Sequence, residues 1–285
     1  IPFHYSQIYI IFFNLTLRTL VYKYCMSDLF DIVNYNKHPL ENSDYVNFCK
    51  NQIIDKSILI LNDFLTQNCL NELILEALKL EKHAFYCSQK HTILLDKFDS
   101  SKDVNDPLNI EVKSDKGCVP HDLLGENSKL NIIYNSSIFK TFLKEVLNLN
   151  KLYPYADPLS SINYNYYQNT QQLGWHFDNA SFAITLMIQS AEKGGEFEYV
   201  NKGRDYDKNF IDKSYIKRII NNSIKAKKIN ANAGTLVLFY GRNYLHRVTP
   251  VKSFKPRILV TLNYNEEEGT KLSENARLTF FGRIN

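Results

Sequence analysis

The chain has 285 residues, a formal net charge of +4, and 44% hydrophobic and 22% charged residues. These values are ordinary for a globular protein and exclude a disordered or low-complexity chain. The lysines are scattered, and the one dense group, at 225–228, is interpreted as a solvated turn, so we expect no nucleic-acid partner. The five cysteines are widely spaced with no CxxC pair, which argues against a disulfide framework or zinc knuckle and favours reduced thiols in a cytoplasmic protein.

The first 25 residues differ in character from the rest. Their apolar run, 8–13, is too short to span a bilayer, and it lacks the preceding charge and the cleavage site of a signal peptide. We therefore expect no membrane association. Met26 opens "MSDLFDIVNYN", and we expect residues 1–25 to be a non-native or upstream extension of one domain over 26–285.

Helical periodicity dominates the next part of the chain. Residues 63–83, "DFLTQNCLNELILEALKLEKH", place apolar side chains along one helical face, with Asn68 or Asn71 as the candidate cap. The polar segment 91–129 predicts loops and short strands, and 136–149 predicts a second helix with a serine in capping position. We interpret 26–156 as a helical and loop-rich support.

After Pro158 the pattern changes to short β-branched and aromatic runs separated by Gly, Asn or Pro, such as "FAITLMIQ", "GTLVLFYG" and "RILVTLNYN". Several short antiparallel strands at this spacing indicate a sandwich or a jelly-roll barrel. One charged insert, 201–230, has a helix-like middle and is a candidate lid.

A histidine and an aspartate stand two residues apart at the entrance of an apolar strand, in "GWHFDNASFAITLMIQ". Side chains two apart in a strand point to the same face, so His176 and Asp178 can chelate one ion. His246, which opens a later strand, is a candidate third ligand, because a jelly roll brings distant strand ends to one mouth. Two histidines and a carboxylate form the facial triad of non-haem Fe(II) oxygenases. A surface histidine beside a turn aspartate is the alternative for an isolated HxD triplet.

Arg257 stands inside the apolar strand "KPRILVTLNY", where a guanidinium is costly unless it has an anionic partner. A bidentate contact with the distal carboxylate of 2-oxoglutarate would satisfy it. An edge-strand arginine that reaches solvent is the alternative.

The run "LGWHFDNASFAITLMIQSAEKGGEFEYV", with "GTLVLFYGRNYLHRVTPV" and "KPRILVTLNY", resembles the Fe(II)/2-oxoglutarate-dependent dioxygenase superfamily. Within it, the chain is most similar to the subgroup of radical halogenases and hydroxylases of free amino acids such as lysine. The resemblance implies a mostly β fold with N-terminal helices and a double-stranded β-helix core, a cupin-like jelly roll, over residues 157–268.

The resemblance also assigns roles to residues. It implies that His176, Asp178 and His246 bind Fe(II), with 2-oxoglutarate and O₂ as co-substrates. Arg257 would hold 2-oxoglutarate, helped by a tyrosine of "NYNYYQ", for which the candidates are Tyr167 and Tyr166.

One of the ligands discriminates between two reactions. Halogenases of this group have Gly or Ala in place of the carboxylate, which frees a metal position for halide. This chain retains Asp178. The prediction is therefore hydroxylation of an unactivated C–H bond rather than halogenation.

For the substrate, the candidates are Asn179, Glu196, Glu198, His121 and Arg242. A carboxylate from "GGEFEYV" at the cavity wall would suit a free cationic amino acid, while a solvated strand face is the alternative. A charged residue near the metal could hold a substrate carboxylate. Rival functions are a peptidyl prolyl or lysyl hydroxylase and a non-catalytic metal-binding jelly-roll protein; the oligomeric state is left open.

Overall fold

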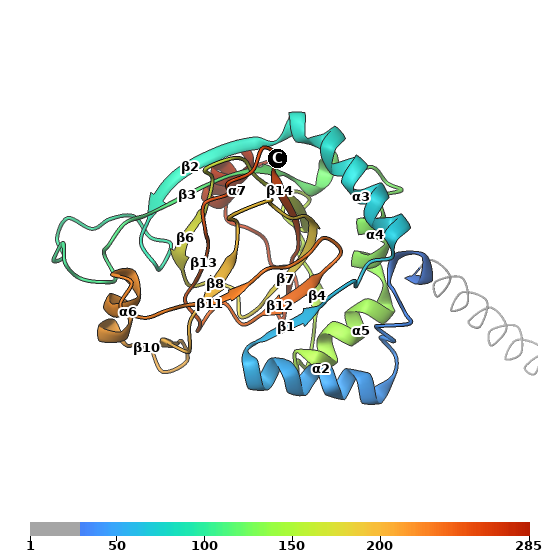
Figure 1. The fold of residues 1–285 in the computed structure, drawn as a ribbon, viewed down its shortest axis with the longest axis horizontal. Helices are drawn as coiled ribbons and strands as arrows, with labels where there is room; N and C mark the ends of the chain where they lie inside the picture. Colours follow the sequence, from blue (N-terminus) through green and yellow to red (C-terminus); the bar gives the residue numbers. More distant parts are fainter. Residues whose placement is uncertain (1–28) are drawn as a thin grey trace, which may run out of the picture.

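The computed structural model of the chain describes residues 29–285, so the expected extension at 1–25 lies outside the described residues. Helices form the first part of the fold and recur near its end (Figure 1). They are α2 (Ser43–Lys56), α3 (Gln67–Leu80), α4 (Lys129–Asn135), α5 (Ser137–Val146), α6 (Lys213–Ile220) and α7 (Glu274–Phe281), with short 3-10 turns η1 (Glu81–His83) and η2 (His121–Leu123). Within 29–285, no helix is long and apolar enough to cross a bilayer.

The larger sheet has seven strands, and every neighbouring pair is antiparallel. In spatial order these are β1 (Ile58–Leu61), β12 (Leu236–Phe239), β7 (Ala183–Gln189), β14 (Arg257–Leu262), β5 (Ile162–Tyr167), β3 (Val112–Val119) and β2 (Phe85–His91). Its central strands, β7, β14 and β5, are β-branched and aromatic runs that sequence patterning predicts as strands.

A second antiparallel sheet faces the first. It consists of β11 (Lys227–Ile229), β8 (Phe197–Tyr199), β13 (His246–Val248) and β6 (Leu173–His176). Two short antiparallel pairs complete the strands: β9 (Arg204–Asp205) with β10 (Phe210–Ile211), which are consecutive in the chain, and β4 (Tyr153–Pro154) with the distant β15 (Tyr264–Asn265). The two sheets enclose a jelly-roll core, which confirms the predicted double-stranded β-helix.

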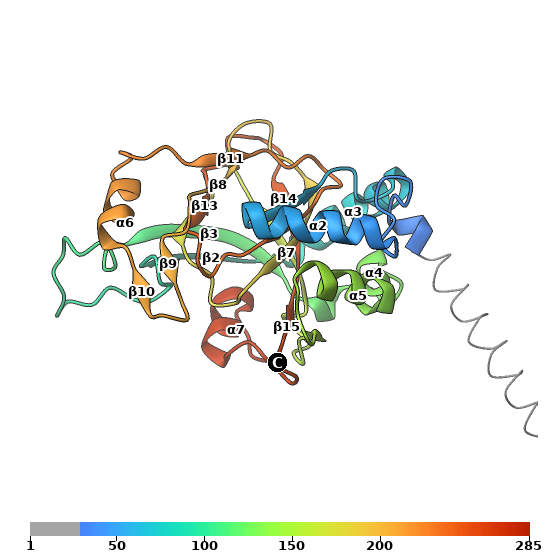
Figure 2. The ribbon, with the colours of Figure 1, turned by 90° about the horizontal axis from the view of Figure 1, so that it is seen from below.

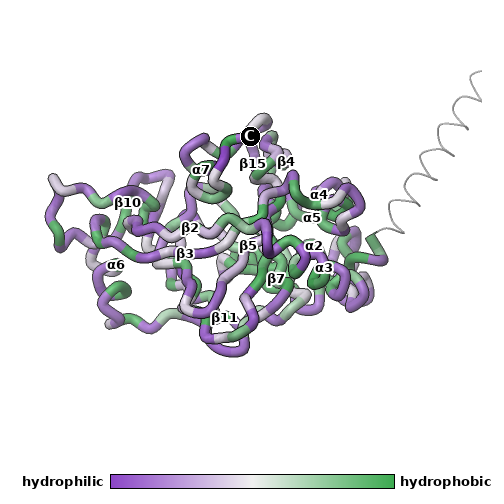
Figure 3. Tube along the Cα trace, turned by 90° about the horizontal axis from the view of Figure 1, so that it is seen from above, coloured by the Kyte–Doolittle hydropathy of each residue, from purple (hydrophilic) through white to green (hydrophobic). Residues whose placement is uncertain are grey.

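The outer face of the larger sheet is covered by helices. Alternation along β5 directs Tyr164 and Tyr166 outward, where their hydroxyls reach Glu76 and the backbone of Ala77 in α3. Figure 3 shows that hydrophobic residues are concentrated along β7 and the neighbouring helices, whereas β2 and β3 are more polar. Burial of this outer face is the main source of stability, since it contains the largest cluster of buried apolar side chains.

The helix boundaries follow from their caps. α3 starts after Thr66, whose hydroxyl accepts from the N–H of Cys69, so neither Asn68 nor Asn71 is the cap that we expected. Both asparagines lie inside the helix, because Thr66 comes before them and already satisfies a free N–H. α5 has the predicted serine cap: Ser136 accepts from the N–H of Phe139.

The part of the chain before residue 157 contributes more than support. β1 lengthens one edge of the larger sheet, and β2 with β3 lengthens the other. The polar segment 91–129, expected as loops and short strands, thus includes the eight-residue strand β3. This strand lacks the apolar alternation of a half-buried strand, because its inward residues Ser114, Lys116 and Cys118 line the cavity rather than an apolar core.

The insert at 201–230 contains β9, β10, α6 and β11. Figures 1 and 2 place α6 and β10 at the end of the molecule opposite helices α2 to α5. α6 is anchored there by Ile216 and Ile219, which pack with Trp175 and Phe177. Within the insert, the cavity described below is lined by Ile229 of β11, whereas α6, β9 and β10 do not contribute to its wall.

Candidate active site

Three side chains with metal-binding atoms converge where β6 ends and β13 begins. His176 is the last residue of β6, His246 is the first of β13, and the two lie opposite each other in the antiparallel pair. Oδ1 of Asp178 lies 3.4 Å from Nε2 of each histidine. One ligand atom from each side chain lies within 4.8 Å of the other two. The three predicted ligands therefore form one cluster.

The second ring nitrogen of each histidine contacts the backbone. Nδ1 of His176 donates to the carbonyl of Gly174 over 2.8 Å, and Nδ1 of His246 donates to the carbonyl of Tyr244 over 2.9 Å. A carbonyl can only accept, so the neutral rings hold their proton on Nδ1 and leave the Nε2 lone pair free. Both Nε2 atoms face Asp178, as a shared metal ion requires.

The protonation states also suit a metal. Burial and the neighbouring His246 lower the pKa of His176. Burial by itself would raise the pKa of Asp178, but attraction to the imidazoles of His246 and His176 in their protonated forms outweighs it and holds that pKa well below its usual range, and a bound cation would take the place of those protons. Neutral histidine and ionised aspartate are the forms that ligate a cation.

Asp178 occupies a space that only a glycine leaves open. Its N–H donates to the carbonyl of Gly241 over 3.1 Å, and a Cβ at position 241 would overlap Oδ2 of Asp178. Oδ2 is buried and has no hydrogen-bond partner in the protein. A buried carboxylate oxygen without a partner is costly, and a bound cation offsets that cost. The residues present therefore fit a metal ion.

The three ligands open into a cavity of about 350 Å³ between the two sheets. Its wall is formed mainly by inward-facing side chains of β5, β7, β14, β3 and β2, and Phe280 and Phe281 of α7 cover part of it. α7 packs against β2 and β3 beside the end of the chain (Figure 2). Sequence patterning did not identify this helix, although it contributes directly to the cavity.

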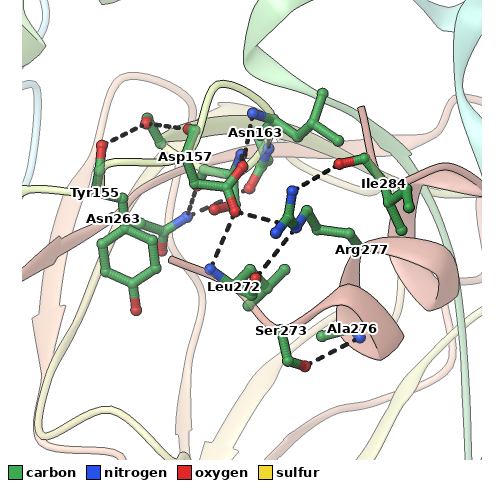
Figure 4. A network of polar contacts seen from close by, with 12 residues as sticks. Tyr155, Asp157, Asn163, Asn263, Leu272, Ser273, Ala276, Arg277 and Ile284 are labelled. Carbon is green, nitrogen blue, oxygen red and sulfur yellow. Dashed lines mark hydrogen bonds and ion pairs between the residues drawn. The ribbon is translucent and has the colours of Figure 1, made fainter. Parts of the chain in front are cut away.

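A buried carboxylate holds α7 in place. Oδ2 of Asp157 accepts from the N–H of Leu272 over 3.0 Å and lies 3.6 Å from Nε of Arg277 (Figure 4). Its Oδ1 accepts from the N–H groups of Leu159 and Ser160. The segment that precedes β5 and the helix that covers the cavity are thus joined through one side chain.

Arg257 lies in the cavity wall as a buried cation without an acidic partner. It is only 5% exposed, its Nη1 has no hydrogen-bond partner, and no carboxylate within residues 29–285 forms a salt bridge with it. Burial lowers its pKa, and its guanidinium lies 5.4 Å from the ring centre of Tyr167. A buried guanidinium without a partner indicates a site for an anionic ligand, for which bidentate binding of a carboxylate is the best match.

The structure distinguishes the two candidate tyrosines. Tyr167 faces the cavity and pairs with Arg257 in the β5–β14 register. Tyr166 points to the opposite face of the sheet, where its hydroxyl donates to the carbonyl of Ala77 over 2.7 Å. The expectation that Tyr166 contacts the co-substrate is therefore wrong, because adjacent residues of a strand face opposite sides.

The two glutamates proposed for the cavity wall lie elsewhere. Phe197 lines the cavity, so Glu198 points outward, where it forms salt bridges with Arg247 at 2.7 Å and Lys228 at 3.2 Å. Glu196 accepts a hydrogen bond from the hydroxyl of Thr249 and lines an adjoining smaller pocket instead of the central one. Neither supplies the predicted carboxylate for a cationic substrate, since the face of β8 is the reverse of that expected.

The other substrate candidates are also outside the cavity. His121 lies in η2, where its Nε2 is 2.7 Å from Oδ1 of Asn131. Asn179 is exposed, and its carbonyl accepts from Nε and Nη2 of Arg242 at 3.1 and 2.8 Å. Arg242 therefore secures the loop after Asp178 rather than contacting a molecule in the cavity.

Sequence reasoning missed several side chains that do line the cavity, among them Lys116 and His91. His91 is fixed by Thr92 and Ser114, and its ring meets that of His176 edge-on with 6.3 Å between centres. The alternation of Ser114, Lys116 and Cys118 along β3 was the available signal for this wall.

A jelly roll with two histidines and an aspartate at its mouth and a buried arginine in its wall defines the class of 2-oxoglutarate/Fe(II) oxygenases, and its residues fit both Fe(II) and 2-oxoglutarate. The sequence profile of one family, described as halogenase D, matches residues 42–277. The chain therefore belongs to the halogenase D family. No curated protein matches it significantly.

Solved structures agree in fold. A prolyl hydroxylase from Trichoplax adhaerens, in complex with a peptide fragment of the hypoxia-inducible-factor oxygen degradation domain, is 15% identical, with a TM-score of 0.51 over 83% of this chain and 94% of that one. The non-haem alpha-ketoglutarate-dependent epimerase SnoN of nogalamycin biosynthesis is 12% identical, with a TM-score of 0.54 over 79% and 82%. The carbocyclase SnoK of the same biosynthesis is 10% identical, with a TM-score of 0.51 over 78% and 83%. At these identities the likeness is one of fold alone.

Proposed function

We propose that the protein is an Fe(II)/2-oxoglutarate-dependent hydroxylase of an unactivated C–H bond in a small molecule, a free amino acid. The observation on which this rests is the position of Asp178, with its Oδ1 at 3.4 Å from Nε2 of both His176 and His246. The carboxylate thus takes the third protein position of the facial triad.

The overall reaction consumes one substrate C–H bond, one 2-oxoglutarate and one O₂, and yields the alcohol, succinate and CO₂. Bound Fe(II) would supply the activation of O₂, with 2-oxoglutarate as the two-electron reductant. Arg257 would neutralise and orient the distal carboxylate of 2-oxoglutarate, beside the ring of Tyr167. Gly174 and Tyr244 would keep the two imidazoles in the ligating tautomer.

The family profile favours a second reaction, halogenation. Coordination number argues against it in this chain. Asp178 would supply the third protein ligand to Fe(II), and its carboxylate would occupy the position that a halide needs.

The size of the cavity supports a small substrate. About 350 Å³ lies at the small end of the range for ligand pockets, and α7 covers part of it, which disfavours a peptidyl substrate. A cationic amino acid is not part of the proposal, because Glu196 and Glu198 do not line the central cavity.

The test is aerobic incubation of the purified chain with Fe(II), 2-oxoglutarate and a pool of free L-amino acids, in parallel with chloride and with bromide. Succinate and product masses are followed by mass spectrometry. Succinate coupled to one amino acid that gains one oxygen supports the proposal. A product that gains chlorine or bromine would establish halogenation instead. Succinate without an oxidised amino acid would move the substrate to another class.

Two substitutions at position 178 test whether Asp178 is a metal ligand. Asp178→Ala is expected to abolish hydroxylation, and full activity in this variant would disprove the assignment. Asp178→Gly leaves the same metal position without a protein ligand, so any incorporation of halide is expected in this variant. A wild-type protein that binds metal but never forms succinate with any substrate would favour a non-catalytic metal-binding protein.

A further inference from the structure

A second cation lies in the same cavity as Arg257. Lys116 is on the inward face of β3, one residue before Gly117, which pairs with Tyr166 of β5. Arg257 lies on the other side of β5, paired with Tyr167. The inward side chain of Tyr167 therefore stands between the two cations.

The Lys116 ammonium is enclosed and only partly satisfied. Nζ donates to Oδ1 of Asn165 over 2.6 Å and lies 5.1 Å from the ring centre of Phe280, and no carboxylate within residues 29–285 forms a salt bridge with it. Burial alone would lower the pKa of Lys116, whereas interactions with Cys118 and Tyr167 raise it. Cys118 is a second hydrogen-bond partner, so one of the three donors is left for a ligand.

The ammonium is displaced from Arg257 toward α7. Asn165, which accepts its hydrogen bond, is two residues from Tyr167 on the same face of β5 and pairs with Leu259 rather than Arg257. Phe280, the neighbouring ring, belongs to α7. Lys116 therefore points to a different part of the cavity from the one that Arg257 occupies.

The charges of the cavity leave Lys116 without a counter-charge. Among the lining side chains from the described part of the chain, 29–285, the only carboxylate is that of Asp178. Fe(II) with this carboxylate keeps one positive charge, Arg257 and Lys116 add one each, and dianionic 2-oxoglutarate removes two. One positive charge remains, and a buried charge without a counter-charge is unfavourable.

We propose that the Lys116 ammonium binds a carboxylate of the substrate to be hydroxylated, so that the site selects free carboxylic acids over amides and peptide-bound residues. This rests on the proposed function and assigns its substrate class. Lys116 is then a residue that determines specificity. It distinguishes a free amino acid from the same amino acid within a peptide chain, where the carboxyl group has become an amide.

The test uses the full chain loaded with Mn(II) in place of iron, so that binding is measured without turnover. Calorimetry gives the Kd of 2-oxoglutarate for wild type, Lys116→Met, Lys116→Arg and Arg257→Met. Thermal unfolding of the Mn(II)–2-oxoglutarate complex is then recorded with each common L-amino acid and with its primary amide. Methionine has nearly the length of lysine without the charge, and arginine keeps the charge.

We expect at least one acid to raise the Tm of wild type, with its amide about tenfold weaker or more. Lys116→Met should lose this effect while its Kd for 2-oxoglutarate stays within about twofold of wild type, and Lys116→Arg should retain part of the effect. Unchanged 2-oxoglutarate binding also shows that the variant is folded.

Three results overturn the inference: an amide that binds as well as its acid, no acid that binds wild type, or a Lys116→Met loss of 2-oxoglutarate affinity equal to that of Arg257→Met. The last result would assign Lys116 to the co-substrate. Failure of wild type to bind 2-oxoglutarate at all would instead overturn the proposed function, so the two failures are distinguishable.

Discussion

Gly241 and Asp178 are in direct contact at the metal site: the N–H of Asp178 donates to the carbonyl of Gly241, and the α-carbon of the glycine faces the carboxylate. A methyl group at position 241 would overlap Oδ2 of Asp178 and come within 3.0 Å of Cε1 of His246. The positions of Asp178 and His246 thus depend on Gly241, which is not itself a metal ligand.

Gly241→Ala should therefore weaken the metal site without unfolding the protein. We expect Mn(II) affinity to fall about 10- to 100-fold, the range for lost support of a ligand, because Asp178 must turn away from the added methyl group. Calorimetric titration with Mn(II) measures this. Gly125→Ala is the matched control, since no atom lies within 4 Å of a Cβ there. Wild-type affinity in Gly241→Ala would show that the carboxylate is not needed where the structure places it.

The stability of the metal-free protein should depend on pH through the protonation of His38. Nε2 of His38 donates to the carbonyl of Asn62 over 2.9 Å, so in the neutral ring Nδ1 accepts from the hydroxyl of Tyr45 over 2.6 Å. Burial lowers the pKa of His38 from 6.5. At a pH between the lowered pKa and 6.5, His38 is protonated in the unfolded chain and neutral in the folded one. The stability that this ring contributes is therefore complete above pH 6.5 and is lost as the pH falls through the folded-state pKa.

Urea unfolding between about pH 5 and 7.5 tests this, with His38→Gln as the variant. We expect the rise of the unfolding free energy with pH to be shallower in His38→Gln, by at most about 1.4 kcal/mol per pH unit for one proton. The exposed His83 offers the control, and His83→Gln should leave the slope as in wild type. An identical slope in His38→Gln would mean that folding does not lower the pKa of this ring.

The metal ligands could be predicted from sequence because their signal is local. His176 and Asp178 are two apart at a strand entrance, and His246 opens a strand, so alternation and strand order suffice. The role of Arg257 could also be predicted from the sequence, because a charged residue inside an apolar run needs an anionic partner. The spacing of the short strands indicated a sandwich or a jelly roll, and the family resemblance selected the jelly roll.

The face of each remaining strand could not be derived in this way. Tyr166 and Tyr167, or Phe197 and Glu198, differ only in which side of a sheet they face, and that is set by pairing with distant strands. Lys116 was missed because a polar cavity wall has the same alternation as a solvated edge. α7 depends on contacts with β2, β3 and Asp157, which sequence periodicity does not contain.

Loss of the Asp157 carboxylate should release α7. Asp157→Asn leaves Arg277 without its counter-charge at a buried position, which typically costs about 3 kcal/mol. Chemical unfolding measures the loss, and proteolysis is expected to remove the last residues first. Asp122→Asn is the control: it breaks the more exposed pair with Arg283 in the same region, which should cost less than about 1 kcal/mol. Equal costs for the two would contradict the role of Asp157 as the anchor of α7.

Tyr167 and Tyr166 form a matched pair in which only one side chain faces the cavity. Tyr167→Phe should raise the Kd of 2-oxoglutarate in the Mn(II)-loaded protein by about 3- to 10-fold, the effect of one lost hydrogen bond. Tyr166→Phe removes the hydrogen bond to the carbonyl of Ala77 and should cost about 1 kcal/mol of stability without changing that Kd. Calorimetry and urea unfolding of both variants give the two quantities. If Tyr166→Phe weakened 2-oxoglutarate binding and Tyr167→Phe did not, the co-substrate would have to lie outside this cavity, because the backbone of β5 separates the two hydroxyls.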